Sequence, residues 1–284
     1  MGVGRQVQQT HPFRLAWTVL KSGDGEDMQF QDASGERIVK RDRLVVIAGL
    51  AGVVAFAWAC TVYLAWDMQH SENALCGMSQ LLMFAMWIIM MAAMMVPSAA
   101  PMILIFAAIN RNRREQERPF VSTGIFLSGY LVVWSGFSAV ITMLQWRLHE
   151  TALLTPTMVS ASPLLSGATL LAAGIFQLTP LKHVCLQHCR SPLGFLLANW
   201  RDDFRGVFGM GLKHGIYCLG CCWLLMALLF VVGVMNLAWL AVLTVFIALE
   251  KIAPAELYLS RVTGLLLMGA GLWMTFAWQQ SLAF

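Results

Sequence analysis

Charged side chains are scarce in this sequence: Asp, Glu, Lys and Arg together make up 12% of the 284 residues. An average soluble protein carries about 25%. Apolar residues reach 58%, so too few polar side chains remain to cover a soluble globule of this size. Disorder is excluded as well, because a disordered chain needs low hydrophobicity and high net charge. The composition therefore indicates an integral membrane protein.

Motifs for nucleotide binding and acyl hydrolysis are also absent. The sequence has no P-loop, no G-x-G-x-x-G after a strand and no G-x-S-x-G. ATP-driven transport and hydride transfer therefore lack support, and no nucleic-acid partner is expected. The seven cysteines are odd in number and lack the regular spacing of a short secreted chain, so a disulfide scaffold is not expected.

Long apolar segments are what the sequence has instead. A bilayer core of about 30 Å takes about 20 apolar residues per helix, and seven segments satisfy this length. The predicted fold is all-α: a polytopic membrane helix bundle of about seven transmembrane helices, with a polar arm over residues 1–43 and a transmembrane domain over residues 44–284. The predicted spans are 44–66, 81–109, 120–144, 163–182, 207–234, 237–256 and 263–280.

The distribution of Lys and Arg predicts the orientation. With the N-terminus in the cytoplasm, 14 basic residues fall in inner segments and one, Arg147, falls in an outer loop. Basic residues gather on the cytoplasmic side of membrane proteins. We therefore expect a multi-pass membrane protein with its N-terminus inside and its C-terminus outside.

The segment KHVCLQHCRSP, residues 182–192, gathers sulfur and imidazole at the end of the fourth predicted helix. If the helix continues through it, Cys185, His188 and Cys189 share one face. Two thiols and an imidazole at this spacing form an edge suited to a soft metal ion. The alternative is a pair of interfacial cysteines beside a solvated histidine.

A second group lies inside the fifth predicted helix, in GLKHGIYCLGCCWLLM, residues 211–226. His214, Cys218, Cys221 and Cys222 stand at i, i+4, i+7 and i+8, within one face of the helix. Glycines at three positions of the same segment predict close approach of a neighbouring backbone. Packing alone is the competing interpretation of these four residues.

A methionine stripe runs along the second predicted helix, where Met86, Met90 and Met94 recur at steps of four. Thioethers bind Cu(I) and suit harder ions poorly, although methionine is also a common packing residue. Measured along the helices, the stripe reaches about the depth of Cys221 and Cys222. This coincidence favours a series of metal ligands along the second predicted helix that reaches the depth of the cysteines.

Three ionisable residues fall within the predicted spans, where charge is costly and usually functional. They are Lys213, His214 and Glu250. An ion pair between Lys213 and Glu250 would neutralise both charges. Alternatively, Glu250 accepts a hydrogen bond from His214 and sets its tautomer.

Three stretches of the sequence together resemble a bacterial family of predicted metal-binding integral membrane proteins, known as domain of unknown function 2182. They are WIIMMAAMMVPSAAP, KHVCLQHCRSPLGF and HGIYCLGCCWLLM, and the resemblance spans residues 45 to 280. It implies a multi-helix bundle and metal binding, without a settled activity. The ligands it implies at matching positions are Cys185, Cys189, His214, Cys218, Cys221 and Cys222.

These observations favour a non-enzymatic Cu(I)-binding membrane protein in copper transfer, copper homeostasis or cuproenzyme maturation. Its partners would be the lipid bilayer and a copper chaperone or recipient membrane cuproenzyme. Zinc is the closest rival ion, because Cys and His also bind it, and the methionine stripe favours copper. Two alternatives stay open: a membrane thiol–disulfide oxidoreductase coupled to quinone, with Cys185/Cys189 and Cys221/Cys222 as redox pairs, and a structural membrane subunit.

The charge distribution generates a test of topology. A reporter fused at the C-terminus is expected to be active on the outer face, and a reporter inserted in residues 110–119 on the cytoplasmic face, because basic segments stay inside. Reporter activity in cells measures both. A C-terminal reporter that reads cytoplasmic would show that the predicted number of spans is wrong by one.

Overall fold

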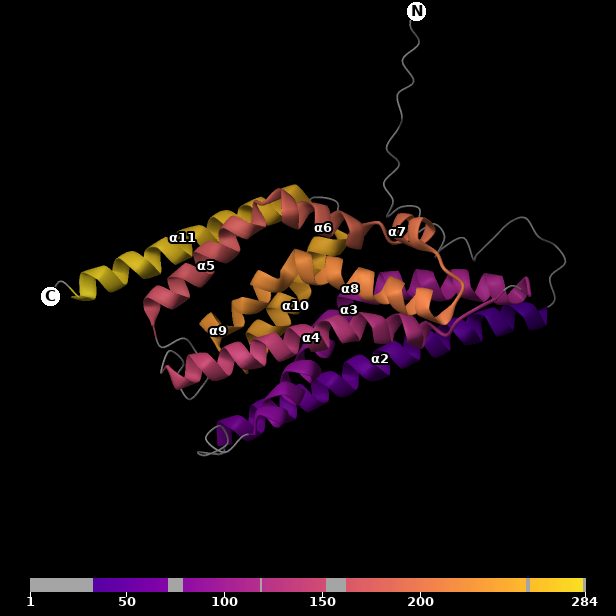
Figure 1. Ribbon diagram of the computed structural model, residues 1–284, viewed down its shortest axis with the longest axis horizontal. Helices are drawn as coiled ribbons and strands as arrows, with labels where there is room; N and C mark the ends of the chain where they lie inside the picture. Colours follow the sequence, from indigo (N-terminus) through magenta and orange to yellow (C-terminus); the bar gives the residue numbers. More distant parts are fainter. Residues whose placement is uncertain (1–32, 71–78, 118, 152–161, 254–255, 283–284) are drawn as a thin grey trace, which may run out of the picture.

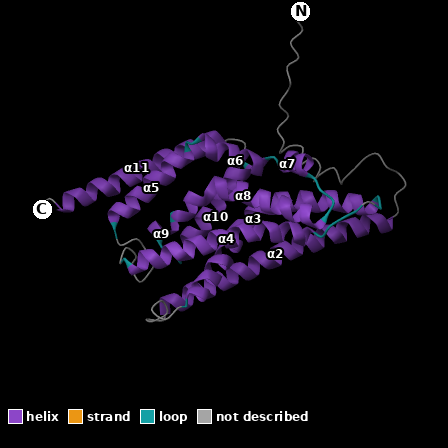
Figure 2. Ribbon diagram, in the orientation of Figure 1, coloured by secondary structure: helices purple, strands orange, loops and turns teal. Residues whose placement is uncertain are grey.

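The structure is a computed structural model that describes residues 33–70, 79–117, 119–151, 162–253 and 256–282. Within these ranges the chain forms helices and short connections and no strand (Figure 2), as the all-α prediction requires. The helices are α2 (Ala33–His70), α3 (Gln80–Glu115), α4 (Thr123–Glu150), α5 (Pro163–Gln177), α6 (Pro180–Arg190), α7 (Pro192–Asn199), α8 (Phe204–Ala227), α9 (Leu229–Val232), α10 (Leu237–Ile252) and α11 (Glu256–Leu282).

The helices form one elongated bundle (Figure 1). The pair α5 and α11 lies along one edge, α2 lies along the opposite edge against α3, and the helices α3, α4, α8 and α10 lie between them. Helix α2 begins at Ala33, inside the segment predicted as a polar arm. The rest of that arm, residues 1–32, lies outside the described residues.

Five described helices are long and apolar enough to cross a membrane, and a sixth span results if the bent pair α5 and α6 is counted as one. By length and composition the structure thus supports five or six spans, where the sequence analysis predicted seven. The difference lies at α10, which has 16 residues and rises about 24 Å. It ends because Ala253 precedes a proline, which disfavours helical backbone, and Ala253 is extended at φ −69° and ψ 135°.

The fourth predicted span does not continue straight through residue 182. Helix α5 ends at Gln177, and α6 begins at Pro180 after a bend of 64°. Thr179 precedes the proline and takes extended backbone at φ −73° and ψ 146°, as expected before proline. Its hydroxyl accepts a hydrogen bond from the Lys182 amide at 3.4 Å, and the cysteine-bearing helix α6 packs on α8.

Helix α3 runs unbroken through Pro97 and Pro101, although proline inside a helix removes a backbone hydrogen bond. Pro97 has no amide hydrogen, so the carbonyl of Ala93 loses its helical donor. The indole of Trp58 on α2 donates to that carbonyl at 3.0 Å. A partner from another helix thereby satisfies the group that proline leaves free.

Helices α4 and α8 touch backbone to backbone at glycines. A Cβ atom on Gly211 would lie 2.1 Å from the carbonyl oxygen of Phe126, and one on Gly129 would lie 2.3 Å from that of Phe208. This confirms the predicted close approach of a neighbouring backbone to α8. The contact places the His214 and Cys218 face of α8 directly against Tyr130 of α4.

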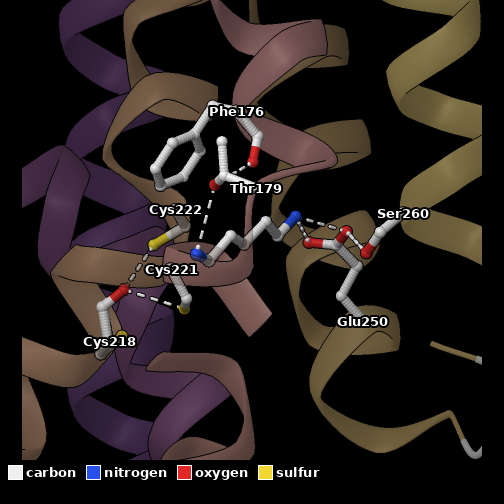
Figure 3. A network of polar contacts seen from close by, with 8 residues as sticks. Phe176, Thr179, Cys218, Cys221, Cys222, Glu250 and Ser260 are labelled. Atoms are coloured by element: carbon white, nitrogen blue, oxygen red, sulfur yellow. Dashed lines mark hydrogen bonds and ion pairs between the residues drawn. The ribbon is translucent and has the colours of Figure 1, made fainter. Parts of the chain in front are cut away.

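An ion pair is buried where α6, α10 and α11 meet. The Lys182 ammonium on α6 lies 2.6 and 2.8 Å from the two carboxylate oxygens of Glu250 on α10, and the two side chains are 0% and 2% exposed. The hydroxyl of Ser260 on α11 donates to the same carboxylate at 2.9 Å. Three helices are therefore joined through one carboxylate (Figure 3).

Both predicted roles of Glu250 are corrected by this pair. Lys213 faces outward from α8 and donates to Asn199 at 2.5 Å, so it does not pair with Glu250. The carboxylate of Glu250 is engaged by Lys182 and Ser260 and does not bond His214. The reason is the bend before α6, which carries Lys182 over the end of α10 while Lys213 lies on another side of α8.

Replacing Lys182 by Met is expected to lower the free energy of unfolding by about 3–5 kcal/mol, because it leaves the Glu250 carboxylate buried and unpaired. The double change Lys182→Met with Glu250→Met should recover most of this loss, since no charge stays unpaired. Unfolding of the purified protein in detergent measures both.

Arg147→Ala is the matched control for these variants. It breaks an exposed pair with Glu150, 3.5 Å apart, and should change the stability by about 0.5 kcal/mol or less. A Lys182→Met variant as stable as the parent would contradict the pairing.

Candidate functional site

Three cysteines of α8 form the centre of the candidate site. Cys218, Cys221 and Cys222 are all buried, as their shared helical face predicts. The thiols of Cys221 and Cys222 both donate to the Cys218 carbonyl, at 3.0 and 2.9 Å (Figure 3). The three sulfurs thus lie around one turn of α8, inside the bundle.

A fourth cysteine reaches this turn from α6. Cys189 is buried, and its side chain lies near those of Cys218 and Cys221. Cys185, half-buried, packs against Gly220: a Cβ atom there would lie 2.8 Å from its sulfur. The bend before Pro180 therefore produces what the sequence only suggests, a convergence of the two cysteine segments.

His188 takes a different direction from the two cysteines of its helix. Its ring stacks on Tyr217 of α8, with centroids 4.1 Å apart and planes 7° apart, and its Nδ1 lies 2.8 Å from the Val184 carbonyl oxygen. The predicted single edge of Cys185, His188 and Cys189 is therefore divided: the cysteines contact the cysteine face of α8, and the histidine contacts a neighbouring aromatic ring.

Two polar residues at Cys218 were not predicted. The Lys251 ammonium of α10 is buried and donates to the Cys218 sulfur at 3.0 Å and to the Ser98 hydroxyl at 2.7 Å. The Tyr130 hydroxyl of α4 donates to the Met95 carbonyl at 3.0 Å and lies 3.2 Å from the same sulfur. Electropositive surroundings of this kind mark reactive cysteines.

The sequence does contain a signal that identifies Lys251 and Tyr130 as candidate site residues. Each places a polar group inside an apolar segment, where such groups are costly and usually functional. Lys251 and Lys182 are two of the 14 basic residues that the predicted topology places in inner segments, and the structure buries both. These two lysines therefore do not contribute to the surface charge on which the predicted orientation rests.

His214 lies one helical turn from Cys218, on the same buried face of α8. It is 2% exposed, and its imidazole stacks on the ring of Tyr130 with centroids 5.6 Å apart. Neither ring nitrogen has a hydrogen-bond partner among the described residues. Buried nitrogens without partners are rare in proteins, so this side chain is a candidate ligand on structural grounds too.

The methionine stripe faces the interior and not the lipid. Met86, Met90 and Met94 are each buried. The next position on the same face, four residues after Met94, is Ser98, which contacts the Lys251 ammonium beside Cys218. The face of α3 that carries the stripe is thus connected to Cys218 through Ser98 and Lys251.

In the part of the chain that the structure describes, no three side chains of the types His, Cys, Asp and Glu are arranged to hold a metal ion. The thiols of Cys221 and Cys222 are engaged by a backbone carbonyl in this conformation. All six cysteines of the described ranges are free thiols. Cys189 lies near Cys218 and Cys221, so thiols also meet across α6 and α8 and not only within the proposed redox pairs Cys185/Cys189 and Cys221/Cys222.

Long apolar helices enclosing buried thiols, thioethers and an imidazole define a membrane-type helix bundle whose interior carries soft donor groups. Residues 84–274 match the PpoB2 family, which is described as a copper chaperone, and the chain belongs to this family. The family description names copper, in agreement with the predicted class of cargo. No curated protein and no solved structure matches the chain.

Proposed function

We propose that this protein is an integral protein of the bacterial inner membrane that binds Cu(I) as cargo and passes it to a recipient cuproenzyme. The central binding site consists of thiols from two helices, Cys189 of α6 and Cys218, Cys221 and Cys222 of α8. The copper chaperone family and the soft donors support copper over zinc. The predicted topology, with the N-terminus inside and the C-terminus outside, belongs to this proposal and requires α10 to cross the membrane as well, which makes seven spans.

The observation that carries the proposal is the set of contacts made by Cys218. Its sulfur contacts Lys251 and Tyr130, its side chain lies near Cys189 of another helix, and its carbonyl accepts from both neighbouring thiols. A cysteine that only fills space does not need a buried ammonium against its sulfur. Soft sulfur donors gathered in a dry interior suit a monovalent soft cation.

Copper binding requires the thiols to turn from the helix backbone toward the ion. Cys221 and Cys222 release the Cys218 carbonyl by rotation about χ1, which staggered rotamers allow. In this structure the ammonium of Lys251 occupies the cation position beside the Cys218 sulfur. When Cu(I) takes that position, Lys251 keeps Ser98, at 2.7 Å, as its partner.

The remaining predicted ligands lie on both sides of this centre. Cys185 and His188 belong to α6 next to Cys189, where they are half-buried and form the approach to the thiols from the outside of the bundle. The stripe of Met86, Met90 and Met94 forms the approach along α3. Thioethers bind Cu(I) more weakly than thiolates, as a transit ligand must.

The α8 site predicts a loss of copper on removal of sulfur. Changing Cys218, Cys221 and Cys222 together to Ser nearly preserves size while replacing soft donors by hard ones, so the Cu(I) bound per protein should fall with the helical fold retained. Competition with a chromogenic Cu(I) chelator measures the stoichiometry, and circular dichroism measures the fold.

Cys60→Ser is the matched control, because Cys60 is a free, half-buried cysteine of α2 outside the cluster. It should bind copper like the parent. Unchanged stoichiometry in the triple variant would remove α8 from the site.

The methionine stripe predicts a kinetic effect. Replacing Met86, Met90 and Met94 by Leu nearly conserves volume and should cost about 1.5 kcal/mol or less at each position. The triple variant should hold copper at the thiols at equilibrium, yet load more slowly from the outer side, because the intermediate ligands are gone. Stopped-flow loading of reconstituted protein with Cu(I) supplied outside measures the rate.

Met143→Leu serves as the control for loading, because Met143 is exposed on α4. Loading of the triple variant at the parental rate would leave the stripe as packing.

A further inference from the structure

The polar imidazole of His214 lies in apolar, aromatic surroundings. The imidazole is 2% exposed and enclosed by the rings of Phe126, Tyr130 and Phe195, with centroids 6.1, 5.6 and 5.7 Å away. Among the described residues, neither of its nitrogens has a hydrogen-bond partner. A phenylalanine would fill the same aromatic box without burying two unsatisfied polar atoms. The imidazole therefore points to a ligand that the chain itself does not supply.

A thioether lies next to this imidazole on α8. Met210 is buried and precedes His214 by four residues, a spacing that places the two side chains about 5–6 Å apart on one face. Neutral imidazole and thioether are both donors for Cu(I). Neither residue belongs to the thiol cluster, since their side chains lie one and two helical turns before Cys218.

Tyr130 stands between this pair and the thiols. Its ring stacks on His214, and its hydroxyl lies 3.2 Å from the Cys218 sulfur. Tyr130 therefore contacts both donor groups: His214 of the Met210 and His214 pair, and Cys218 of the thiol cluster. A cation that moves along this face of α8 passes Tyr130 in going from Cys218 to His214.

We propose that Met210 and His214 form a second Cu(I) site, weaker than the thiol site, on the side of Cys218 toward the start of α8. This proposal rests on the proposed function and assigns to it the step that follows thiol binding. The ion changes ligands from thiolate sulfur to imidazole nitrogen and thioether sulfur, with no change in oxidation state. Neutral donors hold the cation less tightly than thiolates do, which suits a site of release.

The test is a stepwise Cu(I) titration of the full-length protein in detergent, competed with chelators of graded affinity. The parent is expected to take a first equivalent at the thiols and a second about tenfold or more weaker. X-ray absorption of samples with one and two equivalents should show nitrogen scattering added with the second. His214→Phe should lose the second equivalent and keep the first, and Met210→Leu should weaken the second.

His70→Phe is the matched control, because His70 of α2 also packs against an aromatic ring, that of Trp66, but its Nδ1 lies 2.8 Å from a backbone carbonyl oxygen. It should retain both equivalents. If His214→Phe binds both with parental affinities, His214 is a packing residue and the proposal fails. If His214→Phe does not fold, the absorption spectra of the unmodified protein decide.

Other outcomes separate this proposal from the proposed function. Thiolate scattering alone at full loading would overturn the second site and leave the thiol site standing. Nitrogen scattering already present with the first equivalent would place His214 in the thiol site and overturn a separate one. A parent protein that takes up no Cu(I) would overturn both proposals.

Discussion

Two opposite charges at the end of α10 hold the interior of this bundle together. Glu250 pairs with Lys182 of α6 and accepts from Ser260 of α11, while Lys251 donates to Cys218 of α8 and Ser98 of α3. A buried charge without a partner is strongly destabilising, so each contact restricts where the partner helix can lie. Two adjacent residues of one short helix therefore connect α10 to four others.

The position of the thiols depends on this arrangement. Helix α6 leaves α5 at a bend of 64°, and a bend alone leaves the direction of a helix open. The Lys182–Glu250 pair sets that direction, and Cys189, seven residues after Lys182, then lies on the same face of α6 and reaches Cys218 and Cys221. The ion pair therefore acts on the candidate copper site through the helix that carries the fourth thiol, without contacting the ion.

The proposed copper handling has a physical basis in the soft donors of the buried interior. Buried thiols of α6 and α8, thioethers of α3 and the imidazole of His214 line this interior, so in the proposed function Cu(I) exchanges ligands without returning to water. The gradation in donor strength, from thioether to thiolate and then to imidazole with thioether, gives each proposed step a different affinity. Transfer by a copper chaperone needs such differences, because a uniformly tight site would not release its ion.

Three features follow from the sequence, because helical periodicity and composition are local properties. They are the all-helical class, the close backbone approach at Gly211, and the buried helix face of His214, Cys218, Cys221 and Cys222. The inward position of the methionine stripe follows from the same periodicity only once the neighbouring helices are known. Tertiary structure decided three other features. They are the partner of Glu250, the position of Cys189 near Cys218, and the contacts of Lys251 and Tyr130 with the Cys218 sulfur. Each depends on the bend before Pro180 and on the rotation of packed helices, which residues far apart in the chain set together.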